Sequence, residues 1–424
     1  MTRTVASLSA LIVSILLLVS GNAFLTTLLG IRLSLEAVEP SVIGWVLVFY
    51  SVGFVLGTLY VHKVIGRVGH IRAFAVFAAL AAVAALVYPL AINIVLWAVL
   101  RVISGFSVAG VLVVIESWFS SRATNSNRGA LFAIYQIIFY VSAAGGQLVV
   151  NLGNPADFMP FTLAAILLTL ALIPLSLTRM EAPVIETTAR LSFFTLARQS
   201  FSGVAGALVC GVLIGSFYAL GPVYATLAGL DVPRTSLFMA VAIVAAMLLA
   251  WPLGRICDRF DRRRVMFLVS MIAATTAVVV AMTGSANVPL LMVLVSVVVG
   301  FSATLYPVAV AITNDRMDSN RIVAASATLL LSYGIGSVIG PIIMAKLMSL
   351  LGPSGLFWGN AGFLVMLASV TSYRITHTKD VPVADQEHFV AAMPEMSVAL
   401  MEIDPRNEEF QLTPGVDVEV REAR

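Results

Sequence analysis

The feature that most constrains the fold is a pair of short sequences that recur at almost the same distance along the chain. Gly105-Phe106-Ser107 returns as Gly300-Phe301-Ser302, 195 residues later. Ser126-Asn127-Arg128 returns as Ser319-Asn320-Arg321, 193 residues later. A chain of 424 residues with this spacing looks like one half written twice. We therefore expect two structurally similar halves that pack around a shared centre.

The composition places both halves in a membrane. Hydrophobic residues make up 60% of the chain, charged residues make up 11%, and the mean hydropathy is +1.00. A water-soluble surface cannot be built from so few charges. Apolar runs of about 20 residues, the length that crosses a bilayer as a helix, recur between short polar breaks. The pattern predicts twelve spans, six in each half.

The first span, Ser7 to Gly30, has an alternative interpretation as a signal peptide. Arg3 precedes the apolar run, and small residues around Gly21 resemble a cleavage site. Removal of this span would leave five spans in the first half against six in the second. We therefore interpret it as a transmembrane helix.

The predicted fold class is an all-α membrane protein with twelve transmembrane helices in two pseudo-symmetric six-helix bundles. The bundles span residues 1–178 and 203–375. A cytoplasmic linker, residues 179–202, joins them and is expected to contain a short amphipathic helix near Leu191 to Ser200. Residues 376–424 form an acidic tail with a net charge of −7, against +10 for residues 1–375. Docking of this tail on the basic face and a disordered tail both remain open.

Basic residues in the loops predict the orientation. Loops on one side of the membrane contain most of them, including Arg67, Arg122 and Arg264, whereas only Arg32 and Arg234 are assigned to the other side. Because cytoplasmic loops carry an excess of Lys and Arg, we expect both termini in the cytoplasm. The predicted location is the bacterial cytoplasmic (inner) membrane. The two cysteines, Cys210 and Cys257, are expected to serve packing rather than metal binding.

The loop from Gly254 to Arg264 contains the most specific motif, Gly-x3-Asp-Arg-x2-Arg-Arg-Arg. It resembles the loop between the second and third spans of each half in the major facilitator superfamily. The glycine allows close helix approach, and the acid and arginines can lock the cytoplasmic helix ends together. In the first half Gly66 stands in place of the acid, so we expect that latch to borrow Glu116. The predicted cytoplasmic gate comprises Gly57, Arg67, Arg72, Glu116, Gly254, Asp258, Arg259, Arg262 and Asp315.

Further segments resemble the YcaD-type branch of bacterial major facilitators. They include Glu116-Ser117-Trp118, Gly145-Gly146-Gln147 and the tail segment Ile403-Asp404-Pro405-Arg406. The fifth span lacks the Gly-Pro pair of many drug antiporters, and Gly340-Pro341 occurs only in the eleventh span. This weakens the case for drug export. The resemblance implies an architecture and leaves the transported solute undefined.

Arg101 is a charged residue inside the fourth span. The stretch Arg101-Val102-Ile103-Ser104-Gly105 resembles the family's fourth-span pattern, in which one arginine precedes a glycine near the outer end of the helix. A charge in hydrocarbon is costly, so Arg101 should face the bundle interior or a water-filled cavity. Glu116 lies fifteen residues further along the same helix, about 22 Å away, and cannot be its partner. A role in substrate or proton coupling and a purely structural role, through backbone carbonyls, both remain open.

Other polar or aromatic residues near the middle of the spans are candidates for substrate contact. Asn22 is the strongest of them, because an amide within an apolar helix must find a partner. The predicted substrate-binding set is Asn22, Thr26, Arg101, Tyr135, Gln136, Tyr140, Tyr218, Tyr306 and Tyr333.

The sequence contains no metal cluster, phosphate loop or nucleotide-binding pattern, so we expect no cofactor, no metal, no nucleic-acid partner and no enzymatic activity. The predicted function is a secondary active or facilitative transporter of a small molecule that works by alternating access. The expected partners are this small molecule and the lipid bilayer, with proton coupling left open, and the expected state is a monomer. The alternative is a non-transporting membrane sensor or scaffold that acts through its acidic tail, and a polytopic membrane enzyme ranks third.

Overall fold

The computed structural model describes residues 2–124, 127–178, 191–317, 321–378, 381–394, 396 and 400, with side chains from residue 8 onward. The first half consists of α1 (Thr2–Leu35), α2 (Pro40–Val68), α3 (His70–Val87), η1 (Tyr88–Leu90), α4 (Ile94–Ser120), α5 (Arg128–Val149), η2 (Val150–Leu152), α6 (Met159–Leu170) and α7 (Leu172–Ser176). The second half consists of α8 (Phe193–Gln199), α9 (Phe201–Leu227), α10 (Val232–Cys257), α11 (Arg262–Thr283), α12 (Val288–Asn314), α13 (Ile322–Leu351), α14 (Gly355–His377) and η4 (Val383–Asp385).

The described residues contain twelve helical segments that are long and apolar enough to cross a membrane, which confirms the predicted count. The sixth segment, Met159–Ser176, combines α6 and α7. These helices are separated at Ala171 because Pro174 has no backbone N–H and its ring crowds the carbonyl of Leu170. Most helices extend beyond the predicted apolar runs; α1, for example, continues to Leu35.

The repeat is visible in how the helices begin. The side chain of Asn93 accepts a hydrogen bond from the Leu96 amide and starts α4. The side chain of Asn287 accepts a hydrogen bond from the Leu290 amide and starts α12 in the same way, 194 residues later. Both asparagines satisfy a donor that the first turn of a helix leaves free. The two halves therefore share local capping chemistry as well as sequence.

The repeated Gly-Phe-Ser segments occupy matching helix crossings. A Cβ atom on Gly105 of α4 would collide with the carbonyl of Tyr50 in α2. A Cβ atom on Gly300 of α12 would lie 2.6 Å from the Leu249 side chain and 3.3 Å from the Ala245 backbone in α10. In each half, the glycine thus lets the fourth helix approach the second closely. The other repeated sequence, Ser-Asn-Arg, is described only in part, because residues 126, 319 and 320 lie outside the described residues.

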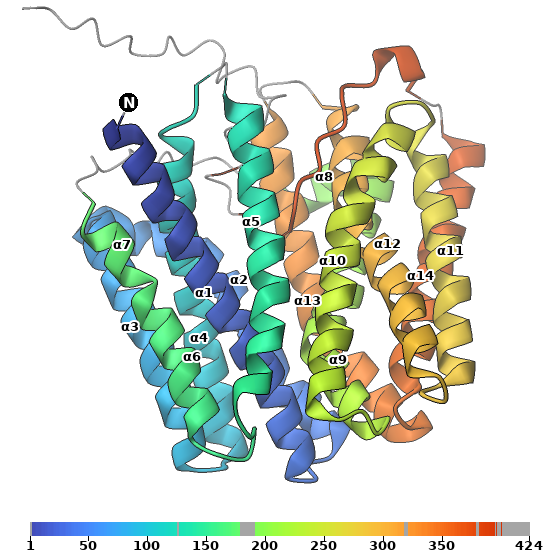
Figure 1. Cartoon of the computed structure of the whole chain (residues 1–424). Helices are drawn as coiled ribbons and strands as arrows, with labels where there is room; N and C mark the ends of the chain where they lie inside the picture. Colours follow the sequence, from blue (N-terminus) through green and yellow to red (C-terminus); the bar gives the residue numbers. More distant parts are fainter. Residues whose placement is uncertain are drawn as a thin grey trace, which may run out of the picture.

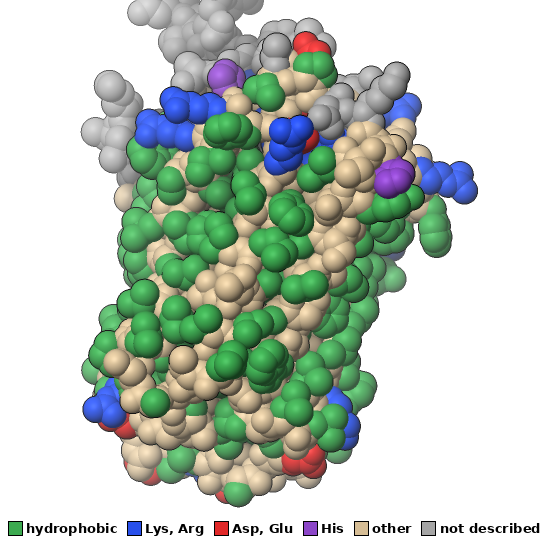
Figure 2. All heavy atoms as spheres, turned by 90° about the vertical axis from the view of Figure 1, so that its right-hand side faces the viewer, with side chains coloured by type: hydrophobic (Ala, Val, Ile, Leu, Met, Phe, Trp, Pro, Cys, Tyr) green, Lys and Arg blue, Asp and Glu red, His purple; other side chains and the backbone are tan. Residues whose placement is uncertain are grey.

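The two bundles stand side by side with the N-terminus at the upper face of Figure 1. We name this the basic face, because the loops and helix ends there contain Arg67, Arg72, Arg255 and Arg264. Figure 2 shows an apolar belt on the visible side of the molecule, with basic side chains gathered above it. The other end is the opposite face. The expectation that only Arg32 and Arg234 lie there was wrong. Lys346, near the end of α13, also lies there and interacts with the charge of Glu39.

The segments outside the bundles are short where they are described. Helix α8 matches the short helix predicted in the linker. Helix α9 begins at Phe201 and α14 ends at His377, each two residues outside the predicted bundle of residues 203–375. Both cysteines are buried free thiols. Residues 179–190 and 401–424, which include the predicted Ile403 to Arg406 segment and most of the acidic tail, lie outside the described residues.

Candidate functional site: a central cavity and the basic face

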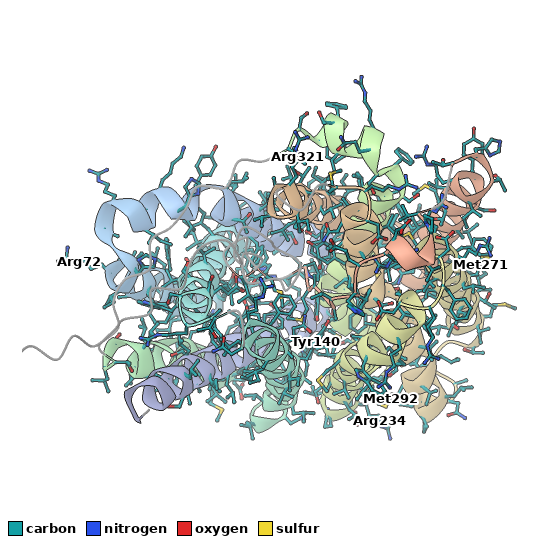
Figure 3. The ribbon with its side chains drawn as sticks, turned by 90° about the horizontal axis from the view of Figure 1, so that it is seen from above. Arg72, Tyr140, Arg234, Met271, Met292 and Arg321 are labelled. Atoms are coloured by element: carbon teal, nitrogen blue, oxygen red, sulfur yellow. The ribbon has the colours of Figure 1, made fainter. Side chains whose placement is uncertain are left out.

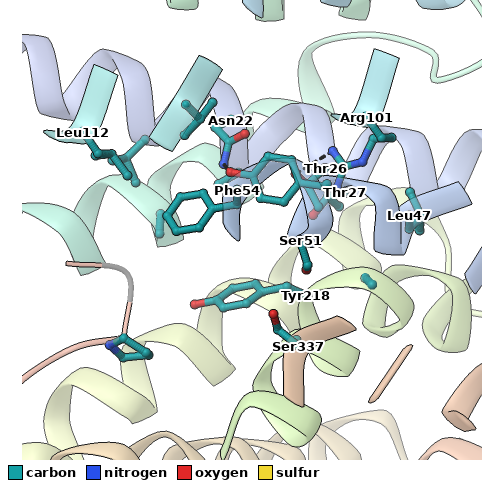
Figure 4. Close-up of a pocket in the computed structure, with 18 of the residues that line it drawn as sticks. Asn22, Thr26, Thr27, Leu47, Ser51, Phe54, Arg101, Leu112, Tyr218 and Ser337 are labelled. Carbon is teal, nitrogen blue, oxygen red and sulfur yellow. Dashed lines mark hydrogen bonds between the residues drawn. The ribbon is translucent and has the colours of Figure 1, made fainter. Parts of the chain in front are cut away.

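A cavity of about 1020 Å³, including its open mouth, lies between the two halves. One wall comes from the first half and contains Asn22, Thr26 and Arg101, and the facing wall contains Tyr218 and Ser337 from α9 and α13 (Figure 4). The remaining lining is mainly apolar, and it includes Val19, Ala23, Leu47, Phe54, Val108, Leu112, Phe139 and Ala143. A concave, mostly apolar site with a few polar groups is the usual form of a small-molecule site.

Arg101 is the charged residue of this cavity. Its exposed fraction is 2%, and its guanidinium carbon lies 4.4 Å from the centre of the Tyr50 ring. Its terminal nitrogen donates a long hydrogen bond of 3.5 Å to the Thr26 hydroxyl, and the Tyr88 phenol is a further neighbour. Its Nε atom has no hydrogen-bond partner among the described residues. The described groups that contact this positive charge, Tyr50, Thr26 and Tyr88, are therefore neutral.

Two hydrogen-bonded pairs fix polar side chains beside Arg101. The Asn22 amide donates a 3.0 Å hydrogen bond to the Tyr50 hydroxyl, which supplies the partner that the sequence required. The Thr27 hydroxyl donates to the Gln147 side-chain oxygen and ties α1 to α5. These hydrogen bonds hold the Asn22 amide, the Tyr50 ring and the Thr27 hydroxyl in place, because each side chain is restrained by a residue of another helix.

The predicted substrate-binding residues divide into two groups. Asn22, Thr26, Arg101, Tyr218 and Tyr333 line the cavity, whereas Tyr135, Gln136, Tyr140 and Tyr306 are not among its lining residues. The Tyr306 ring packs edge-on against Tyr333 at 5.7 Å and so lies one layer behind the wall. Figure 3, viewed from the basic face, shows Tyr140 near the boundary between the halves.

Several cavity residues were absent from the sequence-based set. They are Tyr50, Ser51, Thr27, Gln147, Ser337 and Pro394. Tyr50 could have been found, because Tyr50 and Phe54 share one face of α2 with the close-packed Gly53 and Gly57. Pro394 had no such signal, since it lies in the tail beyond the last span.

The gate residues of the second half form a connected polar cluster at the basic face. Arg262 has an exposed fraction of 1%, and it pairs with Asp315 and donates a 3.2 Å hydrogen bond to the Ala311 carbonyl. Asp258 lies 3.9 Å from the same guanidinium. Burial raises the pKa of Asp315 to about 6, although the Arg262 charge opposes this shift. Arg259, in contrast, is exposed.

The first half has a different arrangement at this face. Glu116 is fully buried and accepts a hydrogen bond from the Tyr135 hydroxyl. Arg67 and Arg72 are exposed, and the structure does not bring them together with Glu116. Figure 3 shows Arg72 at the outer edge of the first half. Gly57 packs against Phe106 and Ala109 of α4, within the bundle.

Tail residues 386–394, which we name the strap, lie between the halves at the basic face. The strap is the trace that descends beside α5 and α10 in Figure 1. Arg262 donates to the carbonyl of Glu387, and Gln136 of α5 donates to the carbonyl of Ala391. The Phe389 amide donates a 2.7 Å hydrogen bond to Asp258, and Pro394 reaches the central cavity. The tail therefore contacts both halves.

Direct contacts between the halves hold the opposite face closed. The Asn151 amide in the first half donates a 2.9 Å hydrogen bond to the Ser236 hydroxyl in α10. The Ser41 amide at the start of α2 donates a 3.1 Å hydrogen bond to the Ser349 hydroxyl in α13. A Cβ atom on Gly44 would collide with Ala345, which shows how closely these two helices meet. These contacts bring the two halves together at the opposite face.

The fold and the central cavity define the class of this protein. The sequence model of the Major Facilitator Superfamily matches residues 5–256 and 229–403, and the chain belongs to this family. It is therefore a multi-pass inner-membrane transporter of that superfamily, and its resemblance to the family is confirmed.

Similar proteins are known by sequence and by structure. An uncharacterized MFS-type transporter YcaD from Escherichia fergusonii is 32% identical over 365 residues, covering 85% of this chain and 92% of the relative. YcaD from Escherichia coli O9:H4 is 33% identical over 367 residues, with the same coverage. The nucleoside transporter NupG superposes with a TM-score of 0.72 at 16% identity, over 88% of this chain and 100% of its own. A D-xylose-proton symporter superposes with a TM-score of 0.66 at 15% identity, over 85% of this chain and 96% of the symporter chain. These two structures share the fold.

Proposed function

We propose that this chain is a secondary transporter that moves a small organic solute by alternating access of its two bundles. The observation that carries the proposal is the central cavity, whose walls come from both halves. A solute held there contacts α1, α2 and α4 on one side and α9 and α13 on the other. Rocking of the halves about such a site would expose it to the two faces in turn.

The proposed orientation places the basic face in the cytoplasm. Lys and Arg residues are concentrated at this face, whereas Arg32, Arg234 and Lys346 lie at the opposite face. The positive-inside rule favours this assignment, and an even number of spans returns both termini to the same side. The present conformation is then inward-facing, because the contacts at Ser41 and Asn151 seal the outside.

We assign the gate of the second half to Asp258, Arg262 and Asp315, with Gly254 as its close-packing point. The ion pair between Arg262 and Asp315 supports this role, because it joins the start of α11 to the end of α12. Proton coupling and facilitated diffusion remain alternative modes of this transporter. Glu116 is the acid within a described span, and its hydrogen bond to Tyr135 is the contact that protonation would change.

The decisive experiment measures motion of the halves without a known solute. Spin labels at Ile71→Cys and Arg264→Cys report on the basic face, and labels at Leu90→Cys and Leu350→Cys report on the opposite face, at exposed positions away from the cavity. The native cysteines are buried, so they should label slowly. We expect two distance populations in which one face closes as the other opens. A single unchanged population at both faces, across a metabolite panel and pH 5 to 8, would overturn the proposal.

The scaffold alternative is tested by truncation after Lys379. A transporter without its tail should retain solute binding in the cavity, whereas a scaffold that acts through the tail should lose its function. Reconstituted flux that is insensitive to both Asp258→Asn and Arg101→Ala would contradict the mechanism proposed here.

A further inference from the structure

We propose that the cavity binds an organic anion, a monocarboxylate with an apolar body, whose charge pairs with Arg101. This inference rests on the proposed transport function and names its substrate class. It begins from an imbalance of charge. Arg101 is the charged residue among those described as lining the cavity, and no Asp or Glu joins it there.

The imbalance is costly without a ligand. A buried guanidinium loses its hydration and normally recovers that energy from a carboxylate or from several hydrogen bonds. Arg101 has a 2% exposed fraction, a long hydrogen bond to Thr26, a further interaction with the neutral Tyr88 phenol, and an Nε atom without a partner among the described residues. Glu116 is about 22 Å further along α4 and is engaged with Tyr135. The described residues supply no counter-charge, so we assign that role to a bound ligand.

The geometry of the site selects a carboxylate. A guanidinium presents parallel N–H donors that match the two oxygens of a carboxylate. Tyr50 covers one face of the guanidinium, so the ligand should approach the edge rather than the face. Asn22 and Ser51 line the same cavity (Figure 4), and each can donate a hydrogen bond to a polar substituent of the ligand or accept one from it. An ammonium ligand would be repelled by Arg101 and would find no acid in the described lining.

The remaining lining selects the body of the ligand. Phe54, Leu112, Phe139 and Val108 are apolar lining residues from the first half. The Tyr218 ring lies across the cavity from Phe54 (Figure 4). Transfer of an apolar group to these walls is favourable by roughly 25 cal/mol per Å² of buried surface. One guanidinium balances one negative charge. The site therefore fits a monoanion better than a phosphate ester or a sugar.

The test uses matched sets of ligands on the purified full-length protein. Benzoate, phenylacetate, hexanoate and octanoate are each compared with the corresponding carboxamide and primary amine by thermal shift and calorimetry. We expect at least one carboxylate to bind saturably and its neutral and cationic counterparts to bind at least tenfold more weakly. Arg101→Gln should weaken carboxylate binding at least tenfold, whereas Arg234→Gln, an exposed arginine at the opposite face, should leave it unchanged.

Several results of these binding measurements would overturn the inference. Equal binding of amides or amines, unchanged carboxylate affinity in Arg101→Gln, or no binding by any carboxylate contradicts an anion site. Equal stabilisation by chloride would identify an inorganic ion as the occupant and overturn the inference.

The melting temperature of the ligand-free protein gives an independent readout. Arg101→Met should be at least as stable as the wild type, because it removes an uncompensated charge, whereas a structural role for Arg101 predicts a marked loss. If the spin labels show motion of the halves but no carboxylate binds, only the proposed substrate class is refuted. If a carboxylate binds but the halves do not move, only the proposed transport function is refuted.

The strap carries a second and independent inference. We infer that residues 386–394 hold the transporter in this conformation and must leave before the basic face can close. Asp258 accepts a hydrogen bond from the Phe389 amide. Arg262, besides its contacts with Asp315 and the Ala311 carbonyl, donates a hydrogen bond to the Glu387 carbonyl. The ring of Phe389 lies 2.8 Å from where a Cβ of Gly254 would be, so it fills the close-packing point of the gate.

The position of the strap explains why it opposes closure. It is held by Gln136 of α5 on one side and by α10 and α11 on the other. Ala392 and Met393 in the strap are buried, and so are Met396 and Leu400 beyond it. The two halves cannot meet at this face while these residues occupy the space between them, because packed side chains exclude one another.

A reversible cross-link tests this inference in one sample. Cysteines are introduced at Gln136 and Ala391, which are in contact through a hydrogen bond, and are oxidised to a disulfide whose formation is checked by mass spectrometry. The disulfide holds the strap in place and reduction releases it, while spin labels attached through thioether bonds remain. With the disulfide closed, the spin-label pair at the opposite face should show only the closed distance. Reduction, or the variant Phe389→Ala without a cross-link, should increase the open population severalfold. An unchanged distribution after both changes would overturn the inference, as would an open population that persists while the disulfide is intact.

Discussion

The backbone amide of Phe389 donates a 2.7 Å hydrogen bond to the carboxylate of Asp258. The acid of the most specific sequence motif is therefore bound by the tail of the same chain. This contact joins two segments 131 residues apart, and it links the proposed gate to the strap that enters the space between the bundles. The first half has no equivalent acid, because Gly66 occupies that place.

Replacement of Asp258 should loosen the strap. In Asp258→Ala the Phe389 amide loses its acceptor, so we expect its hydrogen exchange to accelerate at least tenfold, together with that of neighbouring strap amides. Hydrogen exchange with mass spectrometry measures this directly on peptides covering 386–394. Asp157→Ala, at an exposed acid, serves as the control. Exchange that is equally slow in both variants would show that the hydrogen bond does not hold the strap.

Asp315 should make stability depend on pH in the acidic range. Its pKa is raised from 3.8 to about 6 by burial, so the folded state binds the proton more tightly than the unfolded chain. Its stabilising contribution is complete below about 3.8 and is lost as the pH rises through about 6, a change of about 3 kcal/mol. We expect the stability difference between wild type and Asp315→Asn to fall across this window. A difference that is independent of pH would contradict the raised pKa.

Two glycines of α2 should respond in opposite directions to the same substitution. A Cβ atom at Gly53 would collide with the Val102 carbonyl of α4, whereas nothing lies within 4 Å of a Cβ at Gly66. Gly53→Ala should therefore force the helices apart and lower the melting temperature. Gly66→Ala should raise stability by about 0.5 to 1 kcal/mol, because alanine loses less backbone entropy in a helix. Thermal denaturation in detergent compares them, and a tolerated Gly53→Ala would show that this crossing is looser than described.

Tyr50 should stabilise Arg101 through its ring and Asn22 through its hydroxyl. Tyr50→Phe keeps the ring and removes the acceptor of the 3.0 Å hydrogen bond, which should cost about 1 kcal/mol. Tyr50→Leu also removes the ring that lies 4.4 Å from the guanidinium, and it should cost a further 1 to 2 kcal/mol or so. The order of melting temperatures should be wild type, then the Phe variant, then the Leu variant. Equal values for the two variants would remove the proposed ring interaction.

Residues whose surroundings are set by local sequence were well predicted. The twelve spans followed from apolar runs, since each must match the bilayer by itself. Asn22 and Arg101 were recognised as cavity candidates because a polar group in hydrocarbon requires a partner or water. The tyrosines were harder to assign. Tyr218 and Tyr333 line the cavity, whereas Tyr306 lies behind it, and a helical sequence does not reveal which neighbour each face will meet.

The sequence by itself determined the membrane location, the number of helices and their repeat, because hydropathy, capping and close packing act over short distances. The tertiary structure alone decided that Arg101 meets no acidic partner among the described residues, that Glu116 meets Tyr135, and that the strap reaches Asp258. These relationships join segments that are distant in the chain. They depend on how the two bundles pack, and that packing is the sum of many weak contacts that no local pattern records.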